Sequence, residues 1–210
     1  MQNSLEKAFK KAFELIFLKG TSIIEKTYNK ENIKLDFEAD NYVVEKLHSK
    51  KSIRRMEKKL KGENILTNVA TTASGFGMGF IGMGLPDIPL FVGTLLRTIY
   101  DIGLHYGYQY EEQEEKIYIL RLIQTALSNE DEKHKHYSKL CNIRIEETTL
   151  NTEIITTSKV LSDTLLVEKF VQGIPIIGCV GGVVNYMVFN RVTKFAMIEY
   201  KIRYLEEKLN

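Results

Sequence analysis

The chain has 210 residues, of which 44% are hydrophobic and 27% are charged, and these fractions are ordinary for a globular protein. Such a length forms one large domain or two small ones with a substantial buried core. The net charge of +2 is too small to indicate a nucleic-acid partner by itself. The two cysteines, Cys141 and Cys179, lie outside any metal-binding or redox motif, which is typical of reduced thiols in a cytosolic protein.

The first twenty residues predict an amphipathic helix. Apolar residues recur at helical spacing from Leu5 to Phe17, lysines occupy the opposite face, and Gly20 marks a stop. Because charged residues interrupt the apolar run, the segment does not resemble a secretory signal, and we expect the chain to start in the cytoplasm. Its phenylalanines either pack on the core, which we favour, or lie on a membrane beside the lysines.

Residues 36–61 predict one broken helix or two, and the second half is strongly basic. Between residues 46 and 62, eight lysines and arginines stand against the single acidic residue Glu57. The pattern fits a solvated helix face or a contact with anionic lipid, whereas nucleic acid is disfavoured because no aromatic residues are interleaved. The candidate lipid-contact residues are Lys50, Lys51, Arg54, Arg55, Lys58, Lys59 and Lys61.

Two uncharged, glycine-rich stretches follow. Asp87 is the only charged residue between Asn64 and Leu96, and residues 170–190 carry no charge. Both stretches contain a proline corner and glycines four apart, a spacing that lets helices approach closely. The glycines also fit a dinucleotide-binding pattern, but neither a preceding strand nor a phosphate-binding lysine is predicted, so we expect no cofactor. We predict that Gly75–Gly84 packs against Gly178–Gly182 in the core.

A helix is predicted from the corner at Pro86–Pro89 to about Tyr108, with Asp87 as its cap. One face of this helix carries three polar residues at intervals of four. An aspartate and a histidine so placed suggest catalysis, but an ion-paired helix face is favoured because no nucleophile motif is present. The only residues that could form a catalytic site are Asp87, Arg97, Asp101 and His105.

The remaining chain predicts further helices. Four glutamates between residues 111 and 115 precede an amphipathic helix that ends near Leu127, and residues 191–209 form a charged helix. The threonine-rich residues 129–168 are also predicted to form helices, although their threonine content leaves a strand near 153–157 as an alternative. His134 and His136 diverge on a helix, and no metal-binding motif occurs, so we expect no metal.

Taken together, these segments resemble the EcsC protein family. The resemblance rests on Gly75-x-Gly77-x-Gly79, Gly84-Leu85-Pro86-Asp87-Ile88-Pro89-Leu90, Arg97, Tyr106-Gly107-Tyr108, the glutamates before Ile119-Leu120, Ile174-Pro175-x-x-Gly178, Gly182 and Asn185-Tyr186. The clear part of the resemblance covers residues 64–128 and 170–205. Residues 1–61 match only as a basic helical segment that precedes this part. We therefore predict a single domain of residues 1–210. It implies a bacterial protein without an established activity, encoded beside an ABC transporter, and it brings no agreed catalytic residues.

The sequence therefore predicts an all-α, compact, multi-helix domain with the two glycine-rich segments in its core. The favoured function is non-enzymatic, peripheral association with the inner face of the cell membrane or with a membrane protein complex. One alternative is a helical hairpin inserted in lipid, against which the proline corners and Asp87 argue, since a mid-bilayer charge costs roughly 2.5–3.5 kcal/mol. The other alternative is a hydrolase-like enzyme, and the oligomeric state stays open.

Overall fold

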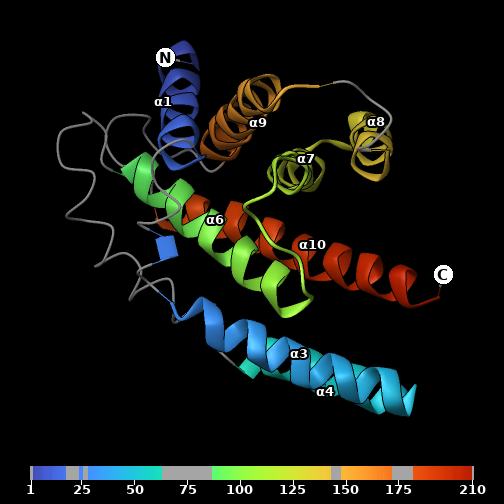
Figure 1. The fold of residues 1–210 in the computed structure, drawn as a ribbon. Helices are drawn as coiled ribbons and strands as arrows, with labels where there is room; N and C mark the ends of the chain where they lie inside the picture. Colours follow the sequence, from blue (N-terminus) through green and yellow to red (C-terminus); the bar gives the residue numbers. More distant parts are fainter. Residues whose placement is uncertain are drawn as a thin grey trace.

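The computed structural model describes residues 2–17, 24–25, 28–62, 87–142, 148–171 and 182–209. In this part of the chain every regular element is a helix, which confirms the predicted all-α fold (Figure 1). The alternative prediction of a strand near residues 153–157 is wrong, because these residues lie inside a long helix. The threonines there donate hydrogen bonds to carbonyls one turn back, as Thr157 does to Glu153, and this satisfies their hydroxyls within the helix.

The described part of the chain contains the following helices, in order along the sequence. Their bounds are Gln2–Leu15 for α1, Lys30–Leu47 for α3, Lys50–Gly62 for α4, Asp87–His105 for α6, Gln113–Leu127 for α7, Glu130–Cys141 for α8, Leu150–Val171 for α9 and Gly182–Leu209 for α10.

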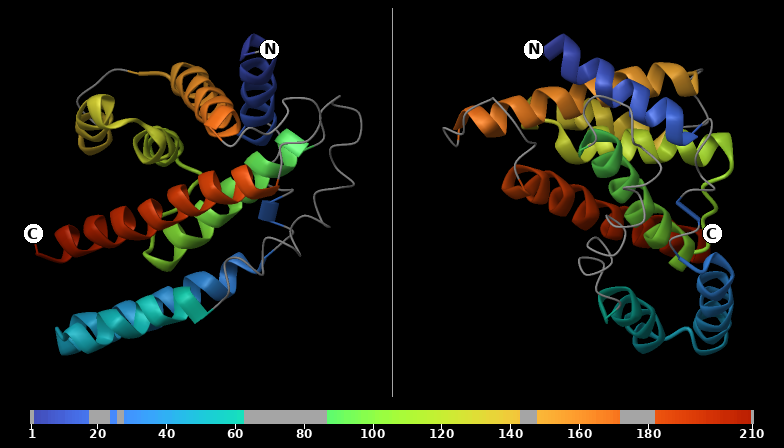
Figure 2. Two further views of the ribbon diagram at one scale, coloured as in Figure 1. Left: turned by 180° about the vertical axis from the view of Figure 1, so that it is seen from behind. Right: turned by 90° about the vertical axis from the view of Figure 1, so that its left-hand side faces the viewer.

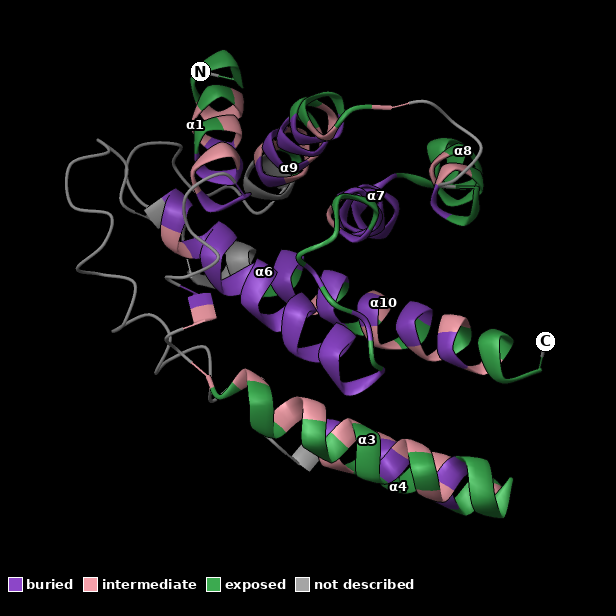
Figure 3. Ribbon diagram, in the orientation of Figure 1, coloured by how far each residue is buried: buried purple, intermediate pink, exposed green. Residues whose placement is uncertain are grey.

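Helix α6 lies at the centre of the molecule and crosses α10 (Figures 1 and 2). It packs on α1 at one end and on α3 at the other, so nearly all of its surface is covered. Its apolar residues are buried on all sides, as Figure 3 shows, namely Ile88, Phe91, Val92, Leu95, Leu96, Ile99 and Ile102. Apolar residues cover most of the circumference of α6, as suits a helix in the interior, and its polar residues Arg97, Asp101 and His105 are confined to one face.

The phenylalanine face of α1 belongs to the core. Phe9 and Phe13 are fully buried between α6 and α9, and the Phe9 ring meets Phe91 edge to face at 6.3 Å. Core packing, the favoured interpretation of this segment, is therefore confirmed. The alternative, in which these phenylalanines enter a membrane, is wrong because their side chains have no exposed surface.

The turn after α6 explains the Tyr-Gly-Tyr motif. The amide of Tyr108 donates to the carbonyl of Gly103, and the amide of Gly107 donates to Leu104. Gly107 has a φ of 90°, so this is the glycine-terminated helix end in which a left-handed residue satisfies the last carbonyls. The helix ends at His105, slightly earlier than the sequence predicts.

Helices α3 and α4 form a hairpin on one side of the molecule (Figure 1). The Asn29 side chain caps α3 by accepting a hydrogen bond from the Asn32 amide. His48 ends α3 in a left-handed conformation, and the Ser49 hydroxyl accepts from the Ser52 amide at the start of α4. Helix α3 packs on α6, and α4 packs on α3, so one face of α4 points away from the body.

Most of the two glycine-rich stretches lies outside the described residues. The expected packing of residues 75–84 on residues 178–182 and the expected cap from the Asp87 side chain belong to these parts of the chain. Among the helices that the structure describes, none combines the length and the apolar composition that crossing a bilayer requires.

Candidate functional site

The outer face of α4 carries a cluster of positive charge. Its inner face buries Ser52, Met56 and Leu60, because these residues recur every four positions along the helix. The intervening positions then project outward, and five of the predicted lipid-contact residues are exposed there, namely Lys50, Lys51, Arg54, Arg55 and Lys58. We call these five the α4 basic face.

The α4 basic face has no counter-charges of its own. Within the part of the chain that the structure describes, none of its five residues forms an ion pair. The only acidic residue of α4, Glu57, points the other way and pairs with Lys201 of α10. No described residue therefore neutralises the positive charge of the face.

Lys59 differs from its neighbours. Its ammonium lies 2.8 Å from the Asp40 carboxylate and 3.1 Å from Asp36, both on α3. The hydrogen bond that Lys59 donates to the buried Asp40 carboxylate raises the pKa of Lys59. Lys59 therefore joins the two helices of the hairpin, while the side chain of Lys61 lies outside the described residues.

The polar face predicted on α6 is real, but it is buried. Arg97, Asp101 and His105 are 6%, 4% and 5% exposed. Nδ1 of His105 lies 2.8 Å from the Asp101 carbonyl oxygen and 3.5 Å from its carboxylate. Because a carbonyl only accepts, Nδ1 carries the hydrogen, and the ring is fixed against its own helix.

Tyrosines surround this buried face. The Arg97 guanidinium stands 5.4 Å from the centre of the Tyr28 ring. The Tyr28 hydroxyl donates to Tyr110 at 2.7 Å, and Tyr110 donates to Glu25 at 3.0 Å. Burial raises the pKa of Tyr28, so its phenol stays protonated at neutral pH. These hydrogen bonds connect Glu25 and Tyr28 to Tyr110 in the α6–α7 link, and the contact of Tyr28 with Arg97 connects them to α6.

The described residues do not supply a nucleophile to the Asp101–His105 pair. Both residues are buried, and no described serine or cysteine bonds to either of them. Nucleophilic catalysis needs a nucleophile within hydrogen-bonding reach of its base. Among the described histidines, cysteines and carboxylates, no group of three is placed to hold a metal ion.

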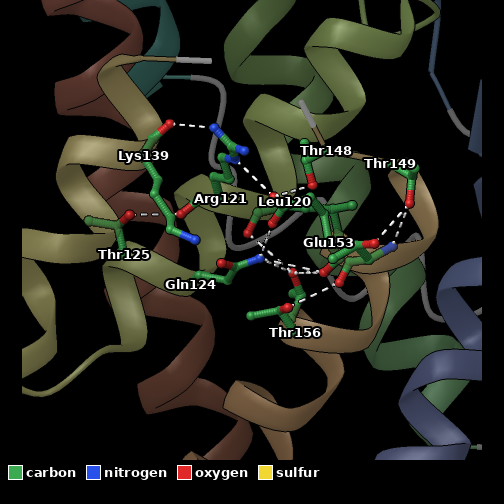
Figure 4. Close-up of polar contacts among 11 residues, drawn as sticks. Leu120, Arg121, Gln124, Thr125, Lys139, Thr148, Thr149, Glu153 and Thr156 are labelled. Atoms are coloured by element: carbon green, nitrogen blue, oxygen red, sulfur yellow. Dashed lines mark hydrogen bonds and ion pairs between the residues drawn. The ribbon is translucent and has the colours of Figure 1, made fainter. Parts of the chain in front are cut away.

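A second buried network was not foreseen in the sequence. The Arg121 side chain of α7 donates to the Glu153 carboxylate of α9 at 3.0 Å and to the Lys139 carbonyl of α8 at 2.6 Å (Figure 4). Gln124 donates to the same carboxylate at 2.8 Å and to Thr157 at 2.9 Å. Arg121 is 1% exposed. The network joins three helices and contains its own counter-charges, so it is structural.

Comparison with known proteins gives the family. The profile of the EcsC protein family matches residues 1–205, so the chain belongs to the EcsC protein family. It is 25% identical over 189 residues to "Protein EcsC" of Bacillus subtilis (strain 168), an alignment covering 90% of this chain and 72% of that protein. It is 29% identical over 150 residues to "Uncharacterized protein YdbA" of the same strain, covering 68% of this chain and 55% of YdbA. The search of solved structures found no match.

The family match extends further than the motifs indicate. The motifs of the sequence resemblance lie in residues 64–128 and 170–205, whereas the profile also includes the basic lead-in and residues 129–169. The α3–α4 hairpin is therefore part of the family domain. This places the α4 basic face within the region that defines the family.

Proposed function

We propose that this EcsC-family protein is a non-enzymatic, peripheral membrane-associated protein that binds anionic lipid at the inner face of the cell membrane through the α4 basic face. The observation that carries the proposal is the set of five exposed cations on one helix face, none of which is ion-paired within the described structure. A solvated helix that serves only stability usually mixes both signs of charge.

The position of α4 in the hairpin supports a membrane contact through the α4 basic face. Helix α4 lies beside α3 and also contacts α6, and its Glu57 pairs with Lys201 of α10 (Figure 2). The opposite side of α4, which carries the α4 basic face, is therefore directed away from the body. At the turn end of the hairpin, Leu47 is 64% exposed next to Lys46 and Lys50. A leucine beside lysines suits the boundary between lipid headgroups and acyl chains.

The expected strength of the contact is modest. A lysine or arginine near an anionic membrane contributes about 1 kcal/mol, so the five residues of the α4 basic face together contribute about 5 kcal/mol. This corresponds to a dissociation constant on the order of 0.1 mM. The attraction acts within a screening length of about 10 Å at 0.1 M salt, so binding is reversible and sensitive to salt.

Co-sedimentation with vesicles tests the proposal. The purified protein is mixed with phosphatidylcholine vesicles that contain or lack phosphatidylserine, at about 0.05 M and about 0.5 M salt. We expect it to pellet only with the anionic vesicles and only at low salt. A protein that stays in the supernatant with anionic vesicles at low salt contradicts the proposal. One that resists high salt and is released only by detergent supports the alternative of a hairpin inserted in lipid.

A further inference from the structure

A cleft of about 480 Å³ lies between α8 and α10. Both helices pack on α7, which forms the floor of the cleft at Tyr118. In Figures 1 and 2, α8 and the α3–α4 hairpin lie on opposite sides of α10. The cleft is therefore remote from the α4 basic face and stays accessible when that face contacts a membrane. Its volume is in the range of small-molecule sites.

The lining of the cleft is strongly acidic. Helix α10 contributes Glu199, Glu206 and Glu207, at intervals that place them on one face, and α7 contributes Glu114. The last turn of α8 also borders the cleft, and the carbonyl end of a helix adds partial negative charge. A cation is the ligand that this field attracts.

Arg203 is the one cation in the lining, and it is already engaged. Its guanidinium donates to the Glu115 carboxylate at 2.7 Å and lies 3.9 Å and 4.6 Å from the ring centres of Tyr108 and Tyr118. The Tyr200 hydroxyl donates to the other Glu115 oxygen at 2.6 Å. Arg203 also lies 3.8 Å from the Glu207 carboxylate, so it is shared between Glu115 and Glu207. The other carboxylates of the lining, Glu114, Glu199 and Glu206, have no paired cation among the described residues.

Glu199 is the observation that points to a ligand. Its side chain lines the cleft, yet the residue is only 7% exposed. It forms no hydrogen bond or ion pair with any residue that the structure describes. Burial raises the pKa of Glu199, so its ionised carboxylate is costly at this position, and a cation that enters the cleft would offset that cost.

We propose that this cleft binds an organic cation, an alkylammonium group on an aliphatic chain, with Glu199 as the principal acceptor. The ammonium would donate charge-assisted hydrogen bonds to Glu199 and be attracted by the carboxylates at the rim. Tyr137 also lines the cleft, and an aromatic ring attracts a cation to its face. The aliphatic part would lie along Leu140 and Ile202.

Calorimetric titration with spermidine tests this inference. We expect the wild-type protein to bind one spermidine saturably at low salt, and Glu199→Gln to weaken the affinity at least tenfold. The matched control is Glu38→Gln, which removes an equally charged but exposed carboxylate from α3 and should leave the affinity unchanged. Circular dichroism verifies that both variants are folded. A wild-type protein that does not bind spermidine overturns the proposal.

Two further measurements sharpen the result. Glu206→Gln, an exposed change at the rim, should weaken binding less than Glu199→Gln and keeps the test valid if the latter fails to fold. Equal losses in the Glu199 and Glu38 variants would show only diffuse attraction to acidic surface and would refute the site. A lysine peptide that binds more tightly than spermidine assigns the cation to a protein partner, whereas the reverse order assigns it to a free amine.

Discussion

The Phe37 ring of α3 occupies the space in which a side chain at Gly107 would stand. A Cβ built on Gly107 would lie 2.4 Å from the nearest ring carbon, and the residue also has a φ of 90°. The glycine of the Tyr-Gly-Tyr motif therefore serves two purposes, since it ends α6 and seats the α3–α4 hairpin. The orientation of the α4 basic face depends on this contact.

Gly107→Ala should destabilise the protein by about 2–4 kcal/mol. The left-handed backbone costs a residue with a Cβ about 1–2 kcal/mol, and the overlap with Phe37 forces the hairpin outward at a similar cost. Denaturant unfolding of the purified variant measures the loss. Placing Gly107→Ala in a Phe37→Ala background should remove the steric part and leave the backbone part. A loss that is the same in both backgrounds would show that Phe37 does not restrain this position.

Breaking the buried Arg121–Glu153 pair should be more damaging than neutralising it. Arg121→Met leaves the Glu153 carboxylate buried without its charged partner, and we expect a loss of about 3–5 kcal/mol in the free energy of unfolding. The double variant Arg121→Met, Glu153→Gln removes both charges of this buried pair, and the new amide can still contact Gln124 and Thr148. The double variant should therefore be more stable than Arg121→Met alone. A double variant that is less stable would contradict this view of the network.

Ionisation of the Glu199 carboxyl should make the folded protein less stable as the pH rises. Burial, followed by repulsion from Glu206, raises the pKa of Glu199 in the folded protein. The unfolded chain therefore loses this proton at lower pH than the folded protein, and stability falls as the pH rises from the ordinary carboxyl range through the raised pKa. Glu199→Gln should raise the melting temperature at about pH 8 and have little effect at about pH 3.5. A lower melting temperature for Glu199→Gln at the higher pH would mean that the carboxylate has a partner in the protein.

Two adjacent lysines of α4 should behave differently. Lys58 is exposed and unpaired among the described residues, whereas Lys59 is held by Asp36 and Asp40. Lys58→Gln should weaken binding to anionic vesicles about fivefold, the equivalent of about 1 kcal/mol. Lys59→Gln changes the net charge equally, but it should mainly increase hydrogen exchange in α3 and α4. Equal losses of vesicle binding would show that total charge, rather than the exposed face, governs the contact.

The helices themselves could be predicted from the sequence because their signals are local. Periodic apolar residues placed α1, α6 and α10, and the interval of four brought Asp101 and His105 together. Local spacing does not specify the depth of a helix in the fold. For this reason the polar face of α6 could be located without showing that it is buried.

Contacts between distant helices could not be predicted in this way. Nothing near Gly107 indicates Phe37, and nothing near Arg121 indicates Glu153, because each pair meets only when separate helices pack. The difference between Lys58 and Lys59 likewise depends on α3, because only Lys59 is paired with its carboxylates. One usable signal was the repeated glutamates of α10, since residues 199, 206 and 207 share a helix face. That pattern predicts an acidic helix face. It does not predict the cleft, which exists only because α8 lies opposite this face.

The central claim is that the α4 basic face binds anionic membrane, and a charge-matched pair of variants tests it most directly. One variant changes all five residues of the face to glutamine. The control changes five exposed lysines on other helices to glutamine, namely Lys7, Lys11, Lys135, Lys159 and Lys194. Both variants have the same net charge, so their difference in vesicle co-sedimentation at low salt isolates the face. We predict that the first variant stays in the supernatant with phosphatidylserine vesicles while the control pellets like the wild type, and equal binding by the two variants would contradict the claim.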